Sequence, residues 1–177
     1  MRLVSTRAVL GAATLLGAAA LVAAKPAIPR APHLGIASFD QLAKPLPLPY
    51  DEAANGDAAI KAAGERARRG GKLLLIDLGG NWCLDCRILA GTMETAPLKP
   101  WLARHYEIVT VDVGRFDKNM GVPARYGATG RLAGVPAVLI VDPRTNRLVN
   151  PGDIAALADA RTMTPQGLAD WLARWAR

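Results

Sequence analysis

Hydrophobic residues in this chain gather into short runs of strand length. Residues 72–78, KLLLIDL, and 135–141, VPAVLIV, are almost continuously apolar, which predicts strands buried on both faces. Residues 106–113, YEIVTVDV, alternate and are rich in β-branched side chains, which predicts a third strand. Residues 147–149 follow a polar turn and are expected to pair with the strand before it. Asp77 stands out as the one acid inside the first run.

Helix-forming segments alternate with these strands. An Ala-rich segment ends at Gly70 and Gly71, which are typical of a helix C-terminus, and Thr164 before Pro165 is typical of a helix N-terminus. We expect helices over residues 57–69, 83–93 and 96–105, and shorter ones beginning at Asp153 and Pro165. Helices that alternate with buried strands predict an α/β fold.

The N-terminal segment is interpreted as a targeting sequence and not as part of the folded domain. In residues 1–24 two arginines precede an uncharged run that ends in small residues, which predicts a signal peptide and a periplasmic or otherwise exported protein. The run is short and weakly apolar for a membrane span, although an uncleaved anchor remains an alternative. Residues 25–50 contain six prolines and are expected to be an extended linker or arm, which leaves 51–177 as the domain.

Composition narrows the class of protein further. The chain has 177 residues, of which 51% are hydrophobic and 21% charged, so one globular domain is expected and a disordered chain is excluded. Only two cysteines and two histidines are present, which predicts neither a disulfide-rich scaffold nor a metal site, and no cofactor is expected. The net charge of +7 includes a basic cluster over residues 66–72 at a helix end, without aromatic neighbours, so no nucleic-acid partner is predicted.

The strongest chemical signal is the sequence Trp82-Cys83-Leu84-Asp85-Cys86, which contains both cysteines of the chain. The pair follows a strand and begins a helix, where backbone N–H groups and the helix dipole favour a thiolate. Cys83, nearer the loop, is the expected attacking group, and Cys86 the resolving one. Haem attachment is excluded because Arg87, not histidine, follows the pair, and zinc lacks two further ligands. An inert structural disulfide remains open.

Three other residues favour redox chemistry over an inert crosslink. Asp77 lies six residues before Cys83, and a lone buried carboxylate needs a partner or a shifted pKa, so it is a candidate to take the proton from Cys86. Trp82 is placed to shield the disulfide face. Pro136 opens a strand, where proline often follows a cis peptide bond.

Residues 72–149, with the motifs LLLID, WCLDC and GVP, resemble the thioredoxin family. The resemblance implies a central mixed sheet flanked by helices. It also implies roles for five residues: Cys83 as nucleophile, Cys86 as resolving thiol, Asp77 as buried acid, Pro136 as the cis-proline facing the pair, and Val135 as backbone partner of a bound peptide. The exported context is similar to periplasmic thioredoxin-like reductases, such as the soluble domain of the transmembrane thiol–disulfide reductant conductor.

The sequence departs from that family at the dipeptide Leu84-Asp85 and in the absence of the lysine that commonly partners the buried acid, which has no match in residues 106–113. The stretch 128–131 looks inserted beside the site. A negative charge on Asp85 disfavours a thiolate at Cys83, which predicts a comparatively reducing pair.

We therefore predict a monomeric thiol–disulfide oxidoreductase that reduces exported proteins and is served by an upstream redox partner. Membrane contact is expected only through a retained leader. The alternatives are a disulfide oxidase or isomerase that uses the same residues, and a non-catalytic binding module with a permanent disulfide.

Overall fold

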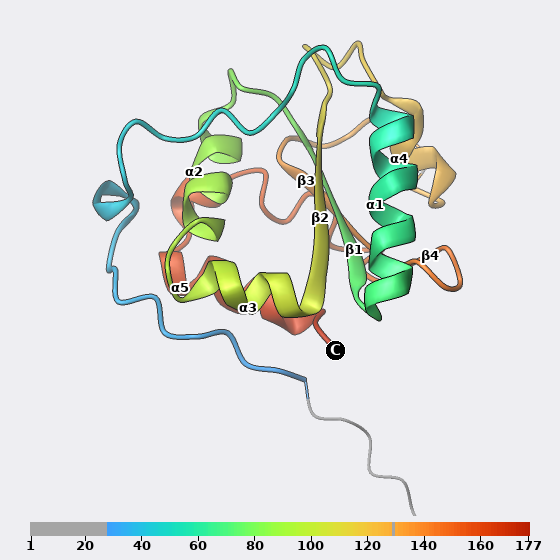
Figure 1. Ribbon diagram of the computed structural model, residues 1–177. Coiled ribbons are helices and arrows are strands. Elements are labelled where there is room, and N and C mark those ends of the chain that lie inside the picture. The colour runs from blue at the N-terminus through green and yellow to red at the C-terminus, as the bar shows by residue number, and fades with distance from the viewer. Residues whose placement is uncertain (1–27, 129) are drawn as a thin grey trace, which may run out of the picture.

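A computed structural model describes residues 28–128 and 130–177, which form a four-stranded mixed sheet with helices on both faces (Figure 1). The strands are β1 (Leu73–Gly79), β2 (Tyr106–Asp112), β3 (Ala137–Asp142) and β4 (Arg147–Leu148). They lie in the order β2-β1-β3-β4, with β1 parallel to β2 and antiparallel to β3, and β3 antiparallel to β4. The predicted α/β class with a central mixed sheet is confirmed.

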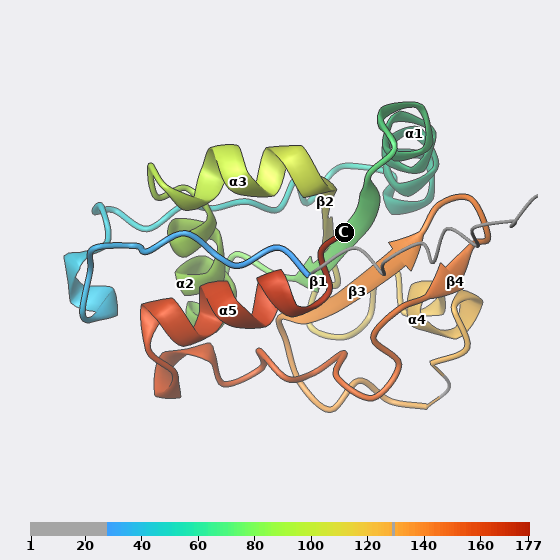
Figure 2. The same cartoon turned by 90° about the horizontal axis from the view of Figure 1, so that it is seen from below.

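The helices divide into two groups. Their bounds are α1 (Gly56–Gly70), α2 (Leu84–Met93), α3 (Leu98–His105), α4 (Gly121–Arg125) and α5 (Pro165–Arg174), with 3₁₀ turns η1 (Phe39–Gln41) and η2 (Ala160–Thr162). Helices α2, α3 and α5 cover one face of the sheet, and α1 and α4 lie on the other side (Figures 1 and 2). The central strand β1 is therefore buried along its whole length, which explains its continuous apolar run.

Alternate side chains of β1 belong to two different apolar clusters, one on each face of the sheet. Leu73 and Leu75 pack with α2, α3 and α5, whereas Leu74, Ile76 and Leu78 pack with α1. Because side chains alternate along a strand, Asp77 belongs to the face covered by α2. The register places Asp77 beside Thr110 of β2 and Val138 of β3.

The predicted helix at Asp153 is wrong. Residues 153–159 form turns that lead into η2, in which backbone N–H groups bond to carbonyls three residues back and do not continue as an α-helix. The carbonyl of Ile154 accepts from the Val138 N–H at 2.8 Å, and the buried side chain of Asn150 bonds to the backbone of both Val138 and Ile140. The helix predicted at Pro165 is present, and the Thr164 hydroxyl caps it by accepting from the Gly167 N–H at 3.0 Å.

Residues 28–50 contain little regular structure, yet they are an arm packed along the domain and not a free linker. Leu34, Leu42 and Leu46 are buried against α2 and α5, and Tyr50 is buried at the arm's end. The Arg87 guanidinium of α2 donates to two arm carbonyls, at 2.9 and 3.1 Å. The predicted signal peptide, residues 1–24, lies outside the described residues. Within the described residues, no helix is both long and apolar enough to cross a membrane.

Candidate active site

The turn between β1 and α2 carries the two cysteines. Cys83 is the N-cap of α2, and its sulfur accepts a hydrogen bond from the Cys86 N–H at 3.1 Å. A disulfide joins the two residues, whose Cα atoms are 5.3 Å apart. Cys83 is 6% exposed and Cys86 is fully buried, so an incoming sulfur reaches the site from the Cys83 side. A sulfur at this position lies at the positive end of the helix dipole.

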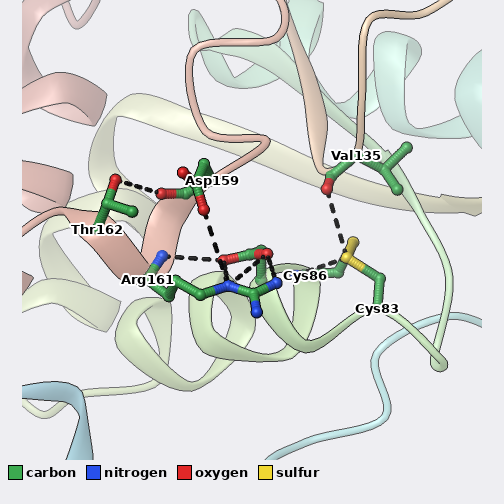
Figure 3. Close-up of polar contacts among 7 residues, drawn as sticks. Cys83, Cys86, Val135, Asp159, Arg161 and Thr162 are labelled. Carbon is green, nitrogen blue, oxygen red and sulfur yellow. Dashed lines mark hydrogen bonds and ion pairs between the residues drawn. A yellow bond between two sulfur atoms is a disulfide. The ribbon is translucent and has the colours of Figure 1, made fainter.

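The segment that leads into β3 faces Cys83. The carbonyl oxygen of Val135 lies 3.4 Å from Cys83 Sγ, and the Val135–Pro136 peptide bond is cis (Figure 3). The structure thus brings Val135 and Pro136, which are more than fifty residues further along the chain, to the disulfide. An acceptor oxygen turned toward a sulfur favours a thiol over a thiolate at that sulfur, because it repels negative charge.

Trp82 forms an exposed apolar rim beside the buried sulfurs. It is 42% exposed, and its indole N–H donates to the Gly114 carbonyl at 2.7 Å. The Arg115 guanidinium lies 4.5 Å from the ring centroid, and the Phe116 ring 6.1 Å from it. Leu84, on the other side of Cys83 in the chain, is 46% exposed.

Asp77 is fully buried on the face of β1 that α2 covers. Neither of its carboxylate oxygens has a hydrogen-bond partner within the described residues. Burial raises the pKa of Asp77 to about 7, against a smaller lowering by the Tyr50 hydroxyl. A carboxyl with this pKa exchanges a proton near neutral pH, which an ordinary surface aspartate does not do.

Gly79 marks the place where Cys86 approaches this part of the interior. Gly79 shares the Asp77 face of β1, and a Cβ placed on it would lie 2.7 Å from Cys86 Sγ and would overlap the hydroxyl of Tyr50. The absence of a side chain at residue 79 therefore leaves room for both Cys86 Sγ and the Tyr50 hydroxyl above the face of β1 that also carries Asp77.

Tyr50 was not among the residues that the sequence singled out for the site. The Asn81 side chain holds the Tyr50 backbone to the cysteine loop, accepting from its N–H at 3.1 Å and donating to its carbonyl at 2.8 Å. Burial, and next the charge of nearby Asp77, raise the pKa of Tyr50, so its hydroxyl stays protonated. Among the described residues, the Tyr50 hydroxyl, and not a lysine of β2, is the polar group that influences the pKa of Asp77, although the two side chains form no hydrogen bond in this structure.

Asp85, between the cysteines, is 3% exposed and is bound by Arg161 of η2. The Arg161 backbone N–H donates to one carboxylate oxygen at 2.9 Å, and Nε donates to both oxygens, at 3.0 and 3.1 Å. Nη2 of the same guanidinium also donates to the carboxylate. Burial alone would raise the pKa of Asp85, but the hydrogen bonds and charge of Arg161 outweigh it and hold the pKa below its ordinary value.

Asp85 carries the negative charge that the sequence predicted, but the sequence did not predict the partner of that charge. The carboxylate is ionised, but the guanidinium compensates its charge. No sequence signal pointed to this pair, since Arg161 is 76 residues from Asp85 and lies in a segment expected to be helical.

Comparison with known proteins agrees with this arrangement. A family model described as thioredoxin-like matches residues 56–143. Thiol:disulfide interchange protein DsbD 1 of Pseudomonas aeruginosa is 30% identical over 109 residues, which cover 58% of this chain. The chain spans only 18% of the length of that protein.

One solved structure is covered by this chain over almost its whole length. The crystal structure of a disulphide isomerase from Xylella fastidiosa Temecula1 shares 36% sequence identity with this chain, with a TM-score of 0.65. The match covers 73% of this chain and 97% of that one.

Proposed function

This chain belongs to the thioredoxin-like family of thiol–disulfide oxidoreductases, and we propose that it reduces disulfides of exported proteins through its Cys83/Cys86 dithiol. The observation that carries the proposal is the position of the disulfide. One sulfur is reachable at the N-terminus of α2, and the other is enclosed above the face of β1 that carries a buried carboxyl of raised pKa.

The reaction begins at Cys83. Its thiolate attacks one sulfur of a substrate disulfide, which forms a mixed disulfide and releases the first substrate thiolate, protonated by solvent. Cys86 then loses its proton and attacks Cys83 Sγ. The mixed disulfide breaks, the second substrate thiolate leaves and is protonated, and the Cys83–Cys86 disulfide forms. Two electrons pass to the substrate, and an upstream dithiol restores the reduced protein.

Asp77 is assigned the role of accepting the proton of the Cys86 thiol. A buried thiol is a poor nucleophile because burial disfavours its thiolate, so a base beside it accelerates the second step. With a pKa of about 7, Asp77 is ionised in part of the molecules at neutral pH and becomes a neutral carboxylic acid when it accepts the proton. That transfer removes a buried negative charge from the interior just as Cys86 gains one.

The reducing direction is supported by the surroundings of Cys83. Its sulfur receives a hydrogen bond from the Cys86 N–H but also faces the carbonyl oxygen of Val135. The charge of Asp85 is compensated by Arg161, so the dipeptide adds no net positive charge. A weakly stabilised thiolate corresponds to a reducing pair, because the dithiol form then gives up its electrons more readily.

Substrate contact is assigned to Trp82, Val135 and Pro136. Trp82 supplies exposed apolar surface, while the backbone next to the cis peptide bond is available to an extended peptide near Cys83. The proposed partners are exported proteins with disulfides and an upstream redox partner, with the chain acting as a monomer. Export rests on the leader at residues 1–24, and an exported compartment is one in which a disulfide can form and persist.

Trapping of mixed disulfides tests the proposal. A Cys86→Ser variant keeps the attacking sulfur and loses the resolving one, so it is expected to accumulate disulfide-linked adducts with exported proteins. The matched control, Cys83→Ser, keeps the buried sulfur and is expected to trap none. If Cys86→Ser yields no adduct that reductant releases, the pair is a permanent crosslink in a binding module.

Disulfide isomerisation is a second candidate, favoured by the match to the Xylella fastidiosa protein described as a disulphide isomerase. An isomerase also starts from the dithiol but releases its substrate with a rearranged disulfide. Refolding of a scrambled multi-disulfide substrate without added reductant separates the two activities, since an isomerase restores native pairings catalytically whereas a reductase consumes its dithiol once.

A further inference from the structure

We propose that Arg161 is a positioning residue that sets the reduction potential of the Cys83–Cys86 pair by holding and compensating the Asp85 carboxylate. The inference rests on the proposed function, because a potential matters only if the pair cycles. Arg161 does not touch the sulfurs, and it acts through the residue that lies between them in sequence.

The contacts between the two residues are more extensive than an ordinary surface ion pair. Both carboxylate oxygens of Asp85 accept hydrogen bonds from Arg161, and the Arg161 backbone N–H adds another. The Asp85 side chain is 4% exposed, whereas that of Arg161 is 53% exposed, so the arginine covers the acid from outside. A planar guanidinium with several donors fits a carboxylate in this way.

The ion pair of Asp85 and Arg161 lies where its charge can influence the reactive sulfur of Cys83. Asp85 is in the first turn of α2, and Cys83 is the N-cap of the same helix. Figure 3 shows Arg161 and the disulfide along the same N-terminal part of α2. The other charge close to the guanidinium is Asp159, whose carboxylate lies 3.8 Å from Nε and whose side chain is 71% exposed. Solvent screens Asp159, so the buried Asp85 is the charge that Arg161 governs.

Removal of Arg161 and removal of Asp85 are expected to shift the reduction potential in opposite directions. Removal of the guanidinium leaves a negative charge near Cys83, which destabilises its thiolate and makes the pair more reducing. Removal of the carboxylate leaves a positive charge, which stabilises the thiolate and makes the pair more oxidising. A contact that only braces η2 against α2 would lower stability in both cases without this reversal of sign.

The test is the redox equilibrium with glutathione of the full chain and four variants. Arg161→Gln is expected to shift the equilibrium constant about three- to tenfold toward a more reducing pair, where tenfold corresponds to about 30 mV. Asp85→Asn is expected to shift it by a similar factor in the other direction, and the double variant to return close to the parent. The rate of Cys83 alkylation against pH is expected to show the matching shifts in its pKa.

Arg177→Gln is the matched control. Arg177 is also 53% exposed and donates to Asp142 at 2.8 Å, an ion pair whose acid belongs to β3 and is not next to a cysteine. This variant is expected to keep the parent's potential even if it loses stability. Equilibrium constants of Arg161→Gln and Asp85→Asn that both stay within about twofold of the parent's, or that move in the same direction, overturn the inference. If Arg161→Gln does not fold, the sign of the Asp85→Asn shift decides. A parent chain that fails to exchange with glutathione at all would instead refute the proposed function.

Discussion

Two aspartates of the strand–turn–helix unit that carries the disulfide, Asp77 and Asp85, are buried, and the protein holds their carboxylates in opposite ways. Asp77, on β1, has no hydrogen-bond partner for either oxygen within the described residues, and burial raises its pKa to about 7. Asp85, on α2, is comparably buried, but Arg161 bonds to both of its oxygens and holds its pKa below the ordinary value.

The difference shows that the partner, rather than burial, decides what a buried acid contributes. Asp77 has no cationic partner in the part of the chain that the structure describes, and its raised pKa lets it exchange a proton in the pH range where the thiols react, so it is suited to acid–base work. Asp85 stays ionised throughout that range and acts as fixed charge. Under the proposed function, Asp77 serves Cys86 as the titrating group. Asp85 supplies a compensated charge in the first turn of α2, the helix that Cys83 caps.

The largest expected effect comes from removal of the titrating carboxyl. Asp77→Asn keeps the shape of the side chain but accepts no proton, so resolution of the mixed disulfide by Cys86 is expected to slow about 100-fold at neutral pH. Single-turnover release of a thiol from a preformed mixed disulfide measures that step directly. In the parent, the rate should rise with pH through about 7, and in the variant this rise should vanish.

Asp85→Asn is the matched comparison for that experiment, because it removes an equally buried carboxylate from the same site. Its rate of resolution is expected to stay within about tenfold of the parent, since Asp85 takes no proton. Equal losses in the two variants would show that both acids act only through structure.

The pH dependence of stability should also separate the two acids. The folded-state pKa of Asp77 is raised, so between about pH 4 and 7 the folded chain binds more protons than the unfolded chain, and its free energy of unfolding falls as pH rises. The folded-state pKa of Asp85 is lowered, so its contribution is present above the unfolded pKa and is lost as pH falls through the folded value.

Chemical denaturation of the oxidised chain across this range measures both slopes. Asp77→Asn is expected to gain a few kcal/mol on the parent at pH 7 and little at pH 4, because the neutral amide avoids the cost of a buried charge. A difference between variant and parent that does not change from pH 4 to pH 7 would contradict the raised pKa of Asp77.

The smallest effect is expected from Tyr50→Phe. The hydroxyl lowers the pKa of Asp77 slightly, so its loss should move the pH profile of the resolving step upward by less than about one unit. Tyr106→Phe is the control, because its buried hydroxyl donates to the Leu172 carbonyl at 2.7 Å, away from the disulfide. Identical profiles for both variants would remove Tyr50 from the site.

The sequence predicted the parts of the site that lie close together in the chain or in regular elements. The cysteines, Asp77 and Trp82 fall within one strand–turn–helix unit, and the apolar run that ends at residue 141 located Val135 and Pro136 at a strand entrance. The alternation of strands and helices likewise predicted the fold class.

The positions of Tyr50 and Arg161 at the site could not be predicted from the sequence, because both residues lie in segments without a long helix or strand. Residues 28–50 have no hydrophobic period, and their path along α2 is set by side-chain donors such as Arg87 that bond to arm carbonyls. Residues 153–159 form turns and no helix, and buried Asn150 and the carbonyl of Ile154 bond to backbone groups of β3. Contacts between distant segments fix the positions of both residues, and local secondary-structure propensity does not predict such contacts.

The potential of the native pair tests the central claim most directly. Oxidised and reduced chain, equilibrated in glutathione buffers at pH 7 and resolved by thiol alkylation, should give a standard potential more negative than about −180 mV, as expected for a pair that donates electrons. A value near −120 mV, about that of a strong oxidant, would contradict the reducing direction. A disulfide that does not exchange with the buffer at all would contradict the redox role itself.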